Sequence, residues 1–295
     1  MADKKVTIVL PVYNGEDYIS FSIDSIVGQT YKNWELIIVN DHSTDNTLSI
    51  CNEYSAKYDK IKVISNEKNL KLPGTLNNGF DHATGDYYTW TSHDNIYKPD
   101  ALEKLVYALS GNPDAVMVYS DYTNIDENGN LLDSVKLLNP QFIVTTNVCG
   151  ASFMYTAEVA KKVGKYDVNL FLAEDYDYWM RVSCEGEVIH IIDDLYLYRR
   201  HSGTLTETKK SSINEQTYKA LEKNFLHLYA EAKKCGLEYQ FFDHMLSRGC
   251  KHTDETLSML LSVDGGYKRY LNRKSTIEKM RNTEVYKLLR KLIKE

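Results

Sequence analysis

Strands and helices alternate along the first hundred residues, and this alternation restricts the fold more than any other feature of the sequence. Short runs rich in β-branched and aromatic residues are separated by segments with apolar residues at helical spacing. Strand–helix–strand units join parallel strands through right-handed crossovers. We therefore predict an α/β fold with a Rossmann-like, mostly parallel sheet flanked by helices. The predicted strands span 6–10, 34–39, 61–64 and 86–91, and the predicted helices span 17–27, 44–58, 73–82 and 100–109.

The rest of the chain is less regular and changes character near residue 206. Further strands are predicted at 116–119, 150–155 and 187–192, with a helix over 174–185. Beyond residue 206 the pattern is helical with no clear strands. We predict two parts, a main domain over residues 1–205 and a helical C-terminal region over residues 206–295.

The composition is that of a soluble globular protein. Hydrophobic residues make up 43% of the chain and charged residues 26%, and the formal net charge of −6 does not favour nucleic acid as a partner. Apolar runs stay below the roughly 20 residues of a membrane span. No secretory signal is visible, and the five scattered cysteines form no CxxC pair. We expect a cytoplasmic protein.

The C-terminal end carries a basic amphipathic pattern. Val285, Leu288 and Leu292 fall on one helical face, while lysine and arginine side chains fall elsewhere. Such a helix can lie on the anionic surface of a membrane at its cytoplasmic face. It can also pack on its own core or on a second copy of the chain, which is the commoner arrangement and the one we favour.

Polar and aromatic side chains follow two of the predicted strands at their C-terminal ends. Pro11 and Tyr13 follow the first strand, and Asn40 and Asp41 follow the second. Open α/β sheets bind ligands at this edge. Tyr13 could stack on a base, and Asn40 or Asp41 could bond its edge. Because neither GxGxxG nor GxxxxGK[ST] follows these strands, the pattern lacks the dinucleotide and P-loop fingerprints.

The strand over 86–91 ends in Ser92-His93-Asp94-Asn95. A carboxylate at a strand end suits a hard divalent cation that also holds phosphate oxygens. Taken alone, Asp94 is better explained as a cap of the following turn. The loops on the neighbouring strands favour the metal-binding interpretation, because together they predict a crevice for a nucleotide.

Four segments resemble family 2 glycosyltransferases of the GT-A fold. In chain order they are VTIVLPVYNGEDYISFSIDSIVGQTY, WELIIVNDHSTDNT, NEKNLKLPGTLNNGFDHATGDYYTWTSHDN and AEDYDYWMRV. The resemblance covers about residues 5 to 205. It implies metal-dependent, inverting transfer of a sugar from a nucleotide-diphosphate donor, most often UDP-linked, to a hydroxyl of a saccharide or glycan acceptor. It makes residues 1–205 the catalytic domain, and leaves the C-terminal region to contact the acceptor, a second copy or a membrane surface.

The resemblance also assigns binding residues. Asp94 matches the metal-binding carboxylate of the family's Asp-x-Asp motif, in which Ser92 replaces the first aspartate. Mn²⁺ or Mg²⁺ is the expected cofactor, held weakly until the donor diphosphate binds. The family often has two aspartates where this chain has Asn40 and Asp41. The predicted nucleotide-binding set is Pro11, Tyr13, Asn40, Asp41, Asn69, Asn77 and His93.

Glu174 and Asp175 begin a predicted helix. An acceptor hydroxyl must lose its proton as it attacks, and a positioned carboxylate is the natural base. Two adjacent acids can also raise one another's pKa. Alternatively, both acids only stabilise the N-terminus of the helix, by electrostatic interaction with the helix dipole. The resemblance assigns the base to Asp175, with Glu174 positioning the acceptor.

Two further segments match the family near the donor. Arg199 and His201 lie in a segment that would fold over the diphosphate or complete the metal shell, although a surface basic cluster has the same composition. Gly150 would permit close approach of the donor sugar. Trp179 is predicted to be either core or a floor for the acceptor sugar.

Two rival functions remain open on the sequence. One is a non-catalytic protein that binds nucleotide sugars through a degraded Asp-x-Asp motif. The other is a sugar-nucleotide pyrophosphorylase, which is disfavoured because no Gly-rich loop bearing Arg and Lys follows the first strand.

Overall fold

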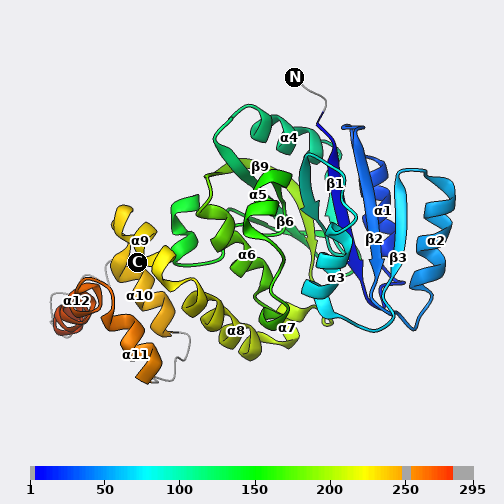
Figure 1. Cartoon of the computed structure of the whole chain (residues 1–295). Helices are drawn as coiled ribbons and strands as arrows, with labels where there is room; N and C mark the ends of the chain where they lie inside the picture. Colours follow the sequence, from blue (N-terminus) through cyan, green and yellow to red (C-terminus); the bar gives the residue numbers. More distant parts are fainter. Residues whose placement is uncertain (1–3, 248–253, 282–295) are drawn as a thin grey trace.

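A single nine-stranded sheet organises the protein (Figure 1). The computed structural model describes residues 4–247 and 254–281. The strand order is β3-β2-β1-β4-β8-β6-β9-β5, with β7 paired to β6. The strands are β1 (Val6–Val12), β2 (Trp34–Asn40), β3 (Ile61–Ser65), β4 (Tyr87–Trp90), β5 (Ile96–Tyr97), β6 (Ala115–Ile125), β7 (Leu131–Val135), β8 (Phe153–Thr156) and β9 (Glu187–Arg199).

The helices lie on both faces of this sheet. They are α1 (Ile19–Val27), α2 (Thr47–Lys57), α3 (Lys71–Phe80), α4 (Ala101–Ser110), α5 (Ala157–Val163) and α6 (Glu174–Ser183), with short 3₁₀ turns η1 (Pro140–Val144) and η2 (Val168–Leu170). Side chains alternate across a strand. On β1, Ile8 and Leu10 therefore pack in one core with α1, α2 and α4, whereas Val9 packs in a second core with α3, α5 and α6.

The sheet is parallel in its first half and mixed in its second. Strands β3, β2, β1 and β4 run parallel, as the alternating pattern predicts. β8 is antiparallel to both β4 and β6, because the chain returns from β6 through the β7 hairpin and η1 instead of a crossover helix. β8 also begins at Phe153 instead of the predicted residue 150, which leaves residues 145–152 as a loop.

The described part of the C-terminal region is helical, as predicted. Its elements are α7 (Leu205–Thr208), α8 (Lys210–Lys223), α9 (Phe225–Lys234), α10 (Glu238–Ser247), α11 (Asp254–Leu261) and α12 (Gly266–Arg281). Helices α9 to α12 lie at the end of the molecule opposite α1 and α2, and α7 and α8 lead to them along the lower side of the view (Figure 1). Apolar side chains of α8 and α9, including Leu221 and Phe225, belong to the same core as Trp179 of α6. Trp179 is fully buried and is therefore a core residue.

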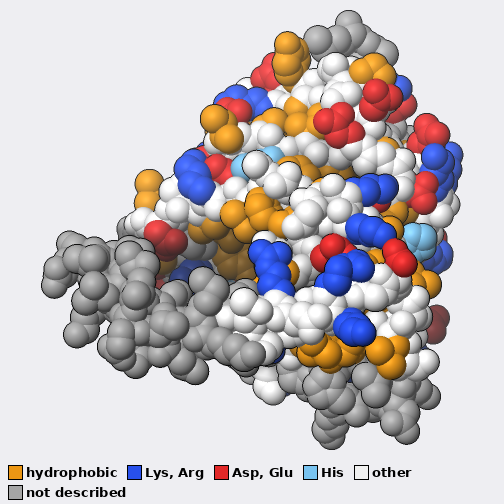
Figure 2. Space-filling view, turned by 90° about the vertical axis from the view of Figure 1, so that its left-hand side faces the viewer, with side chains coloured by type: hydrophobic (Ala, Val, Ile, Leu, Met, Phe, Trp, Pro, Cys, Tyr) orange, Lys and Arg blue, Asp and Glu red, His pale blue; other side chains and the backbone are white. Residues whose placement is uncertain are grey.

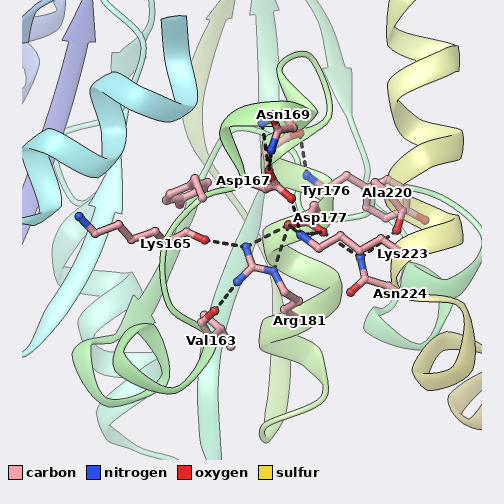
Figure 3. Close-up of polar contacts among 12 residues, drawn as sticks. Val163, Lys165, Asp167, Asn169, Tyr176, Asp177, Arg181, Ala220, Lys223 and Asn224 are labelled. Carbon is pink, nitrogen blue, oxygen red and sulfur yellow. Dashed lines mark hydrogen bonds and ion pairs between the residues drawn. The ribbon is translucent and has the colours of Figure 1, made fainter. Parts of the chain in front are cut away.

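A buried polar network fastens α8 to α6 (Figure 3). Asp177 is fully buried and accepts hydrogen bonds from Arg181 Nε over 3.0 Å and from Asn224 Nδ2 over 2.9 Å. Lys223 Nζ lies 3.1 Å from Asp177 and 2.8 Å from Asp167. Charged groups are rarely buried unless paired in this way, and the network joins the two predicted parts of the chain.

Three observations bear on the membrane contact predicted for the C-terminal region. The amphipathic pattern over 285–293 lies outside the described residues. None of the helices within 4–247 and 254–281 is long and apolar enough to cross a membrane. On the face viewed from the side of the C-terminal helices, lysine and arginine side chains stand among aspartate and glutamate side chains (Figure 2).

Candidate functional site

One large cavity lies at the C-terminal ends of β1, β2 and β4. Its volume is about 960 Å³. The strand-end loops form one wall, the start of α6 forms another, and the segment that follows β9 forms a third. Pro11, Tyr13, Asp41, Asn69, His93, Asp94, Gly150, Glu174, Asp175 and His201 line it. The structure thus brings together ten predicted site residues that lie far apart in the sequence.

The loops after β1 and β2 are tied to each other at the cavity rim. Asn14 donates its N–H to Ser43 Oγ over 3.0 Å, and its Oδ1 accepts the N–H of Thr44 over 2.8 Å. Asn14 has a φ of 50° and Lys71, also on the cavity wall, has a φ of 63°. Non-glycine residues rarely adopt these angles, and such strain concentrates at functional sites.

Asp41 and Tyr13 shape the part of the cavity expected to hold a base. Oδ1 of Asp41 accepts the N–H of Leu70 over 2.7 Å and Nδ2 of Asn66 over 2.8 Å. These bonds fix the carboxylate in the wall. The side chain of Tyr13 is 48% exposed, which leaves its ring free to stack on a ligand.

Two predicted nucleotide contacts do not reach this cavity. Asn40 is buried below it, where its amide bonds Ser65 Oγ and the N–H of Ser43. Asn77 uses both ends of its amide on the backbone of Tyr166, and lines a separate pocket of about 220 Å³. We correct both assignments: these amides satisfy backbone and side-chain partners inside the fold.

Asp94 and His201 form a pair in the wall of the cavity. His201 Nε2 lies 3.1 Å from Asp94 Oδ2. Asp94 Oδ1 is buried and has no hydrogen-bond partner. A buried acceptor of this kind is costly unless a ligand or cation satisfies it. The described residues hold no cluster of three or more metal-ligating side chains, so a cation here would take its remaining ligands from water or a bound diphosphate.

The side chain of His93 is half-buried in the cavity wall. A Cβ on Gly15 would come within 2.5 Å of the His93 ring, so the two residues are in tight contact. Burial lowers the pKa of His93. The imidazole is therefore held neutral at the cavity wall, where it can pack against a ligand.

Arg199 does not line the cavity, and its predicted contact with the diphosphate is corrected. Its Nε donates to the carbonyl of Asp94 over 2.9 Å, and its Nη1 donates to the carbonyls of Asp126 and Glu127 over 3.1 and 3.0 Å. The guanidinium also stacks 4.8 Å from the ring of Tyr18. It thereby fastens the Asp94 loop to the neighbouring hairpin. Arg200, the next residue, lines the cavity instead.

Glu174 and Asp175 meet the cavity at the start of α6. Oε2 of Glu174 accepts the N–H of Leu172 over 2.6 Å, and Leu172 has a φ of 82°. Burial and the neighbouring Asp175 raise the pKa of Glu174 to about 8. Burial also raises the pKa of Asp175. Two carboxyls with raised pKa values in a cleft are typical of acid–base sites.

The raised pKa of Glu174 predicts a pH-dependent stability effect. The unfolded chain ionises this carboxyl near its ordinary value of 4.5, whereas the folded chain does so near 8. The folded state therefore binds the extra proton between these values, and its stability falls as pH rises through this window. Glu174→Gln should match the wild type in melting temperature at pH 4 and exceed it at pH 9.

Thermal unfolding at the two pH values tests this expectation. Glu127→Gln, at an exposed turn position, is the matched control and should give curves parallel to the wild type. A Glu174→Gln curve that is also parallel would show that the carboxyl ionises alike in both states.

Several residues that line the cavity were not predicted from the sequence. Tyr122, Asn124, Asn147 and Arg200 line the cavity without matching any motif that we identified. The Tyr122 ring and Leu137 lie within about 3 Å of a Cβ built on Gly150, whose φ is +47°. Only glycine fits there, because these side chains and the positive φ exclude a Cβ; the approach of a donor sugar at this position stays a prediction.

Comparisons with known proteins agree with this geometry. The family model described as "Glycosyl transferase family 2" matches residues 7–164. An uncharacterized glycosyltransferase of Haemophilus influenzae is 30% identical over 276 residues, which cover 88% of this chain and 84% of that protein. The uncharacterized glycosyltransferase RC0461 of Rickettsia conorii is 32% identical over 250 residues, 79% of this chain but only 40% of that longer relative.

Solved structures share the fold. TarS 1–349 of S. aureus in complex with UDP superposes with a TM-score of 0.62 at 20% identity, over 88% of this chain and 75% of that one. The mannosyltransferase PcManGT from Pyrobaculum calidifontis, in complex with GDP-Man and Mn²⁺, gives a TM-score of 0.61 at 15% identity, over 97% and 83%. The predicted GT-A fold is confirmed.

Proposed function

The chain belongs to glycosyl transferase family 2, and from this membership we propose that it moves a sugar from a UDP-linked donor to a hydroxyl of a saccharide acceptor, with inversion. It is a nucleotide-sugar glycosyltransferase. One observation carries the finer proposal: a single cavity contains the strand-end loops, the Asp94–His201 pair and Asp175. These are the parts that donor binding, departure of the nucleotide and activation of the acceptor each require.

In the proposed reaction Asp175 is the general base. The acceptor hydroxyl gives its proton to the carboxylate as its oxygen bonds to the anomeric carbon, and the bond from that carbon to the nucleotide diphosphate breaks in the same step. No enzyme nucleophile is needed. A raised pKa suits the role, because proton transfer is most efficient when the base titrates near the working pH. Glu174, protonated at neutral pH, would donate a hydrogen bond to the acceptor.

At the donor end, Tyr13 would stack on the base and Asp41 would bond its edge. Asn69 and His93 would complete the pocket, while Arg200 would take the diphosphate contact first assigned to Arg199. Gly150 would let the donor sugar approach the backbone. The complexes of the structural relatives with UDP and with GDP-Man support a nucleotide-sugar ligand at this fold.

A divalent cation fits the residues present. The unpartnered Oδ1 of Asp94 and the imidazole of His201 would hold Mn²⁺ or Mg²⁺. When bound, the cation would neutralise the charge that develops on the departing diphosphate. The Mn²⁺ in the PcManGT complex supports this cofactor.

A thermal-shift panel tests the donor and the metal together. UDP-sugars with Mn²⁺ should stabilise the protein more than GDP- or dTDP-sugars do, since a ligand at 100 times its Kd adds about 2.7 kcal/mol. Asp94→Ala should abolish the dependence on Mn²⁺. Asp17→Ala, an exposed carboxylate, is the control and should respond like the wild type.

Three outcomes would change the proposal. Stabilisation that is independent of metal would contradict the role of Asp94. A larger thermal shift with a GDP- or dTDP-sugar would identify that nucleotide, instead of UDP, as the one carried by the donor. Tight UDP binding with no hydrolysis or transfer would favour a non-catalytic nucleotide-sugar binding protein. The pyrophosphorylase interpretation is set aside, because the matching family is one of glycosyl transferases and not of nucleotidyl transferases.

The C-terminal region remains the proposed contact for the acceptor, for a second copy or for a membrane surface. Leu205 and Ile213 of this region line the cavity, which supports a role in acceptor binding. A cytoplasmic location also stays a prediction.

A further inference from the structure

The carboxylate of Asp175 accepts hydrogen bonds from two sides. Asn147 Nδ2 donates to Asp175 Oδ2 over 3.0 Å. The N–H of Tyr176 donates to Asp175 Oδ1 over 2.7 Å. One bond comes from α6 itself, and the other comes from the loop between η1 and β8. Asn147 therefore restrains the rotation of the carboxylate from outside its own helix.

A second contact restrains the amide of Asn147 in turn. Its Oδ1 accepts the N–H of Cys149 over 3.3 Å, so the NH₂ end is the one that faces Asp175. The same loop is packed tightly at Gly150, where Tyr122 and Leu137 leave no room for a Cβ. Both Asn147 and Asp175 line the cavity, so the bond lies where an acceptor would bind.

We propose that Asn147 is a positioning residue that holds the Asp175 carboxylate in the orientation required of the base. The inference rests on the proposed function, in which Asp175 takes the acceptor proton. With Oδ2 bonded to the amide and Oδ1 to the helix, each oxygen keeps one lone pair in the plane of the carboxylate. The rotation set by Asn147 decides where those lone pairs point.

The same bond also affects ionisation. A neutral N–H donor stabilises the charged form of a carboxylate, so Asn147 opposes the rise in pKa that burial causes at Asp175. The titratable groups that interact electrostatically with Asp175 are Glu174, the thiol of Cys149 and the phenol of Tyr166. Loss of the amide should leave Asp175 protonated to a higher pH.

The experiment measures the Asp175 pKa and turnover separately. Protein labelled with ¹³C only at aspartate carboxyls reports the pKa by NMR, with the Asp175 signal assigned from Asp175→Asn. Asn147→Ala should raise this pKa by about one unit, which is a tenfold change in the ratio of protonated to ionised Asp175 at a given pH. Hydrolysis of UDP-GlcNAc, the donor probe, should fall most on the acid side of its pH profile and recover in part as the pH rises.

Two further variants sharpen the test. Asn147→Asp keeps the shape but replaces the donor with a second carboxylate, and should shift the acid limb of the rate profile further than Asn147→Ala. Thr146→Ala, at the adjacent loop position, controls for disturbance of the loop and should leave the Asp175 pKa unchanged.

The outcomes separate the inference from the proposed function. An unchanged Asp175 pKa together with unchanged turnover in Asn147→Ala would overturn the positioning role, and so would equal losses of turnover in Asn147→Ala and Thr146→Ala. A raised pKa without any shift of the rate profile would support the hydrogen bond but contradict Asp175 as the base.

Discussion

Asp175→Asn is expected to lower turnover by about 10²- to 10⁴-fold, the usual contribution of a general base. The amide cannot accept the acceptor proton, yet it keeps nearly the same shape. Donor binding should persist, because the nucleotide-facing residues Tyr13 and Asp41 lie in the loops after β1 and β2, away from α6 in the chain. The measurements are nucleotide release from the donor, with water as acceptor, and the Kd for UDP in the presence of Mn²⁺.

Glu174→Gln is the matched control for Asp175→Asn. It changes the adjacent carboxyl on the same helix and keeps the bond to the N–H of Leu172. We expect it to reduce turnover less than Asp175→Asn does, because Glu174 positions the acceptor without taking its proton. Unchanged turnover in Asp175→Asn would remove Asp175 from the mechanism, and a larger loss in Glu174→Gln would exchange the two roles.

Asp177→Asn is expected to lower the free energy of unfolding by about 3 kcal/mol, because removing one partner of a buried ion pair leaves the others uncompensated. Asp177 is fully buried and pairs with both Arg181 and Lys223 (Figure 3). Since Lys223 lies on α8, the loss should also loosen the C-terminal region from α6. Urea unfolding measures the stability, and hydrogen exchange of α8 measures the loosening.

Asp167→Asn provides the comparison for this network. Asp167 also pairs with Lys223, over 2.8 Å, but it is partly exposed and its ion pair is worth about 1 kcal/mol or less. Equal losses in the two variants would mean that burial of Asp177 contributes nothing, and that the network behaves as a surface ion pair.

The local pattern predicted most of the elements, because apolar periodicity is a property of neighbouring residues. The helix over 174–185 and the strands at 34–39 and 61–64 appear as α6, β2 and β3 within one or two residues at their ends. The direction of β8 was not predictable in the same way. A strand's own residues are equally apolar whether its neighbour runs parallel or antiparallel. The path of the connecting segment decides the direction in which the strand runs.

The same limit applies to side chains. Asn69 and Asn77 belong to the same predicted segment, yet Asn69 lines the cavity. Asn77 instead forms hydrogen bonds with the backbone of Tyr166, which lies in a distant loop. Arg199 and Arg200 are adjacent, and alternation across the end of β9 buries the first under the Asp94 loop. A polar residue in a motif can bind either a ligand or a backbone group. Which of the two it binds depends on the residues that surround it in the folded protein.

Local patterns in the chain were enough to predict the α/β class, the strand-end loops and the pair of acids at the start of α6, because each follows from residues that are close together. Tertiary packing sets which of those side chains share a cavity. It joined Asp94 to His201, Asp175 to Asn147, and Asp177 to Lys223. Each pair is separated by tens of residues or more, so no local pattern encodes it, and the packing of the elements that carry the two partners brings them together.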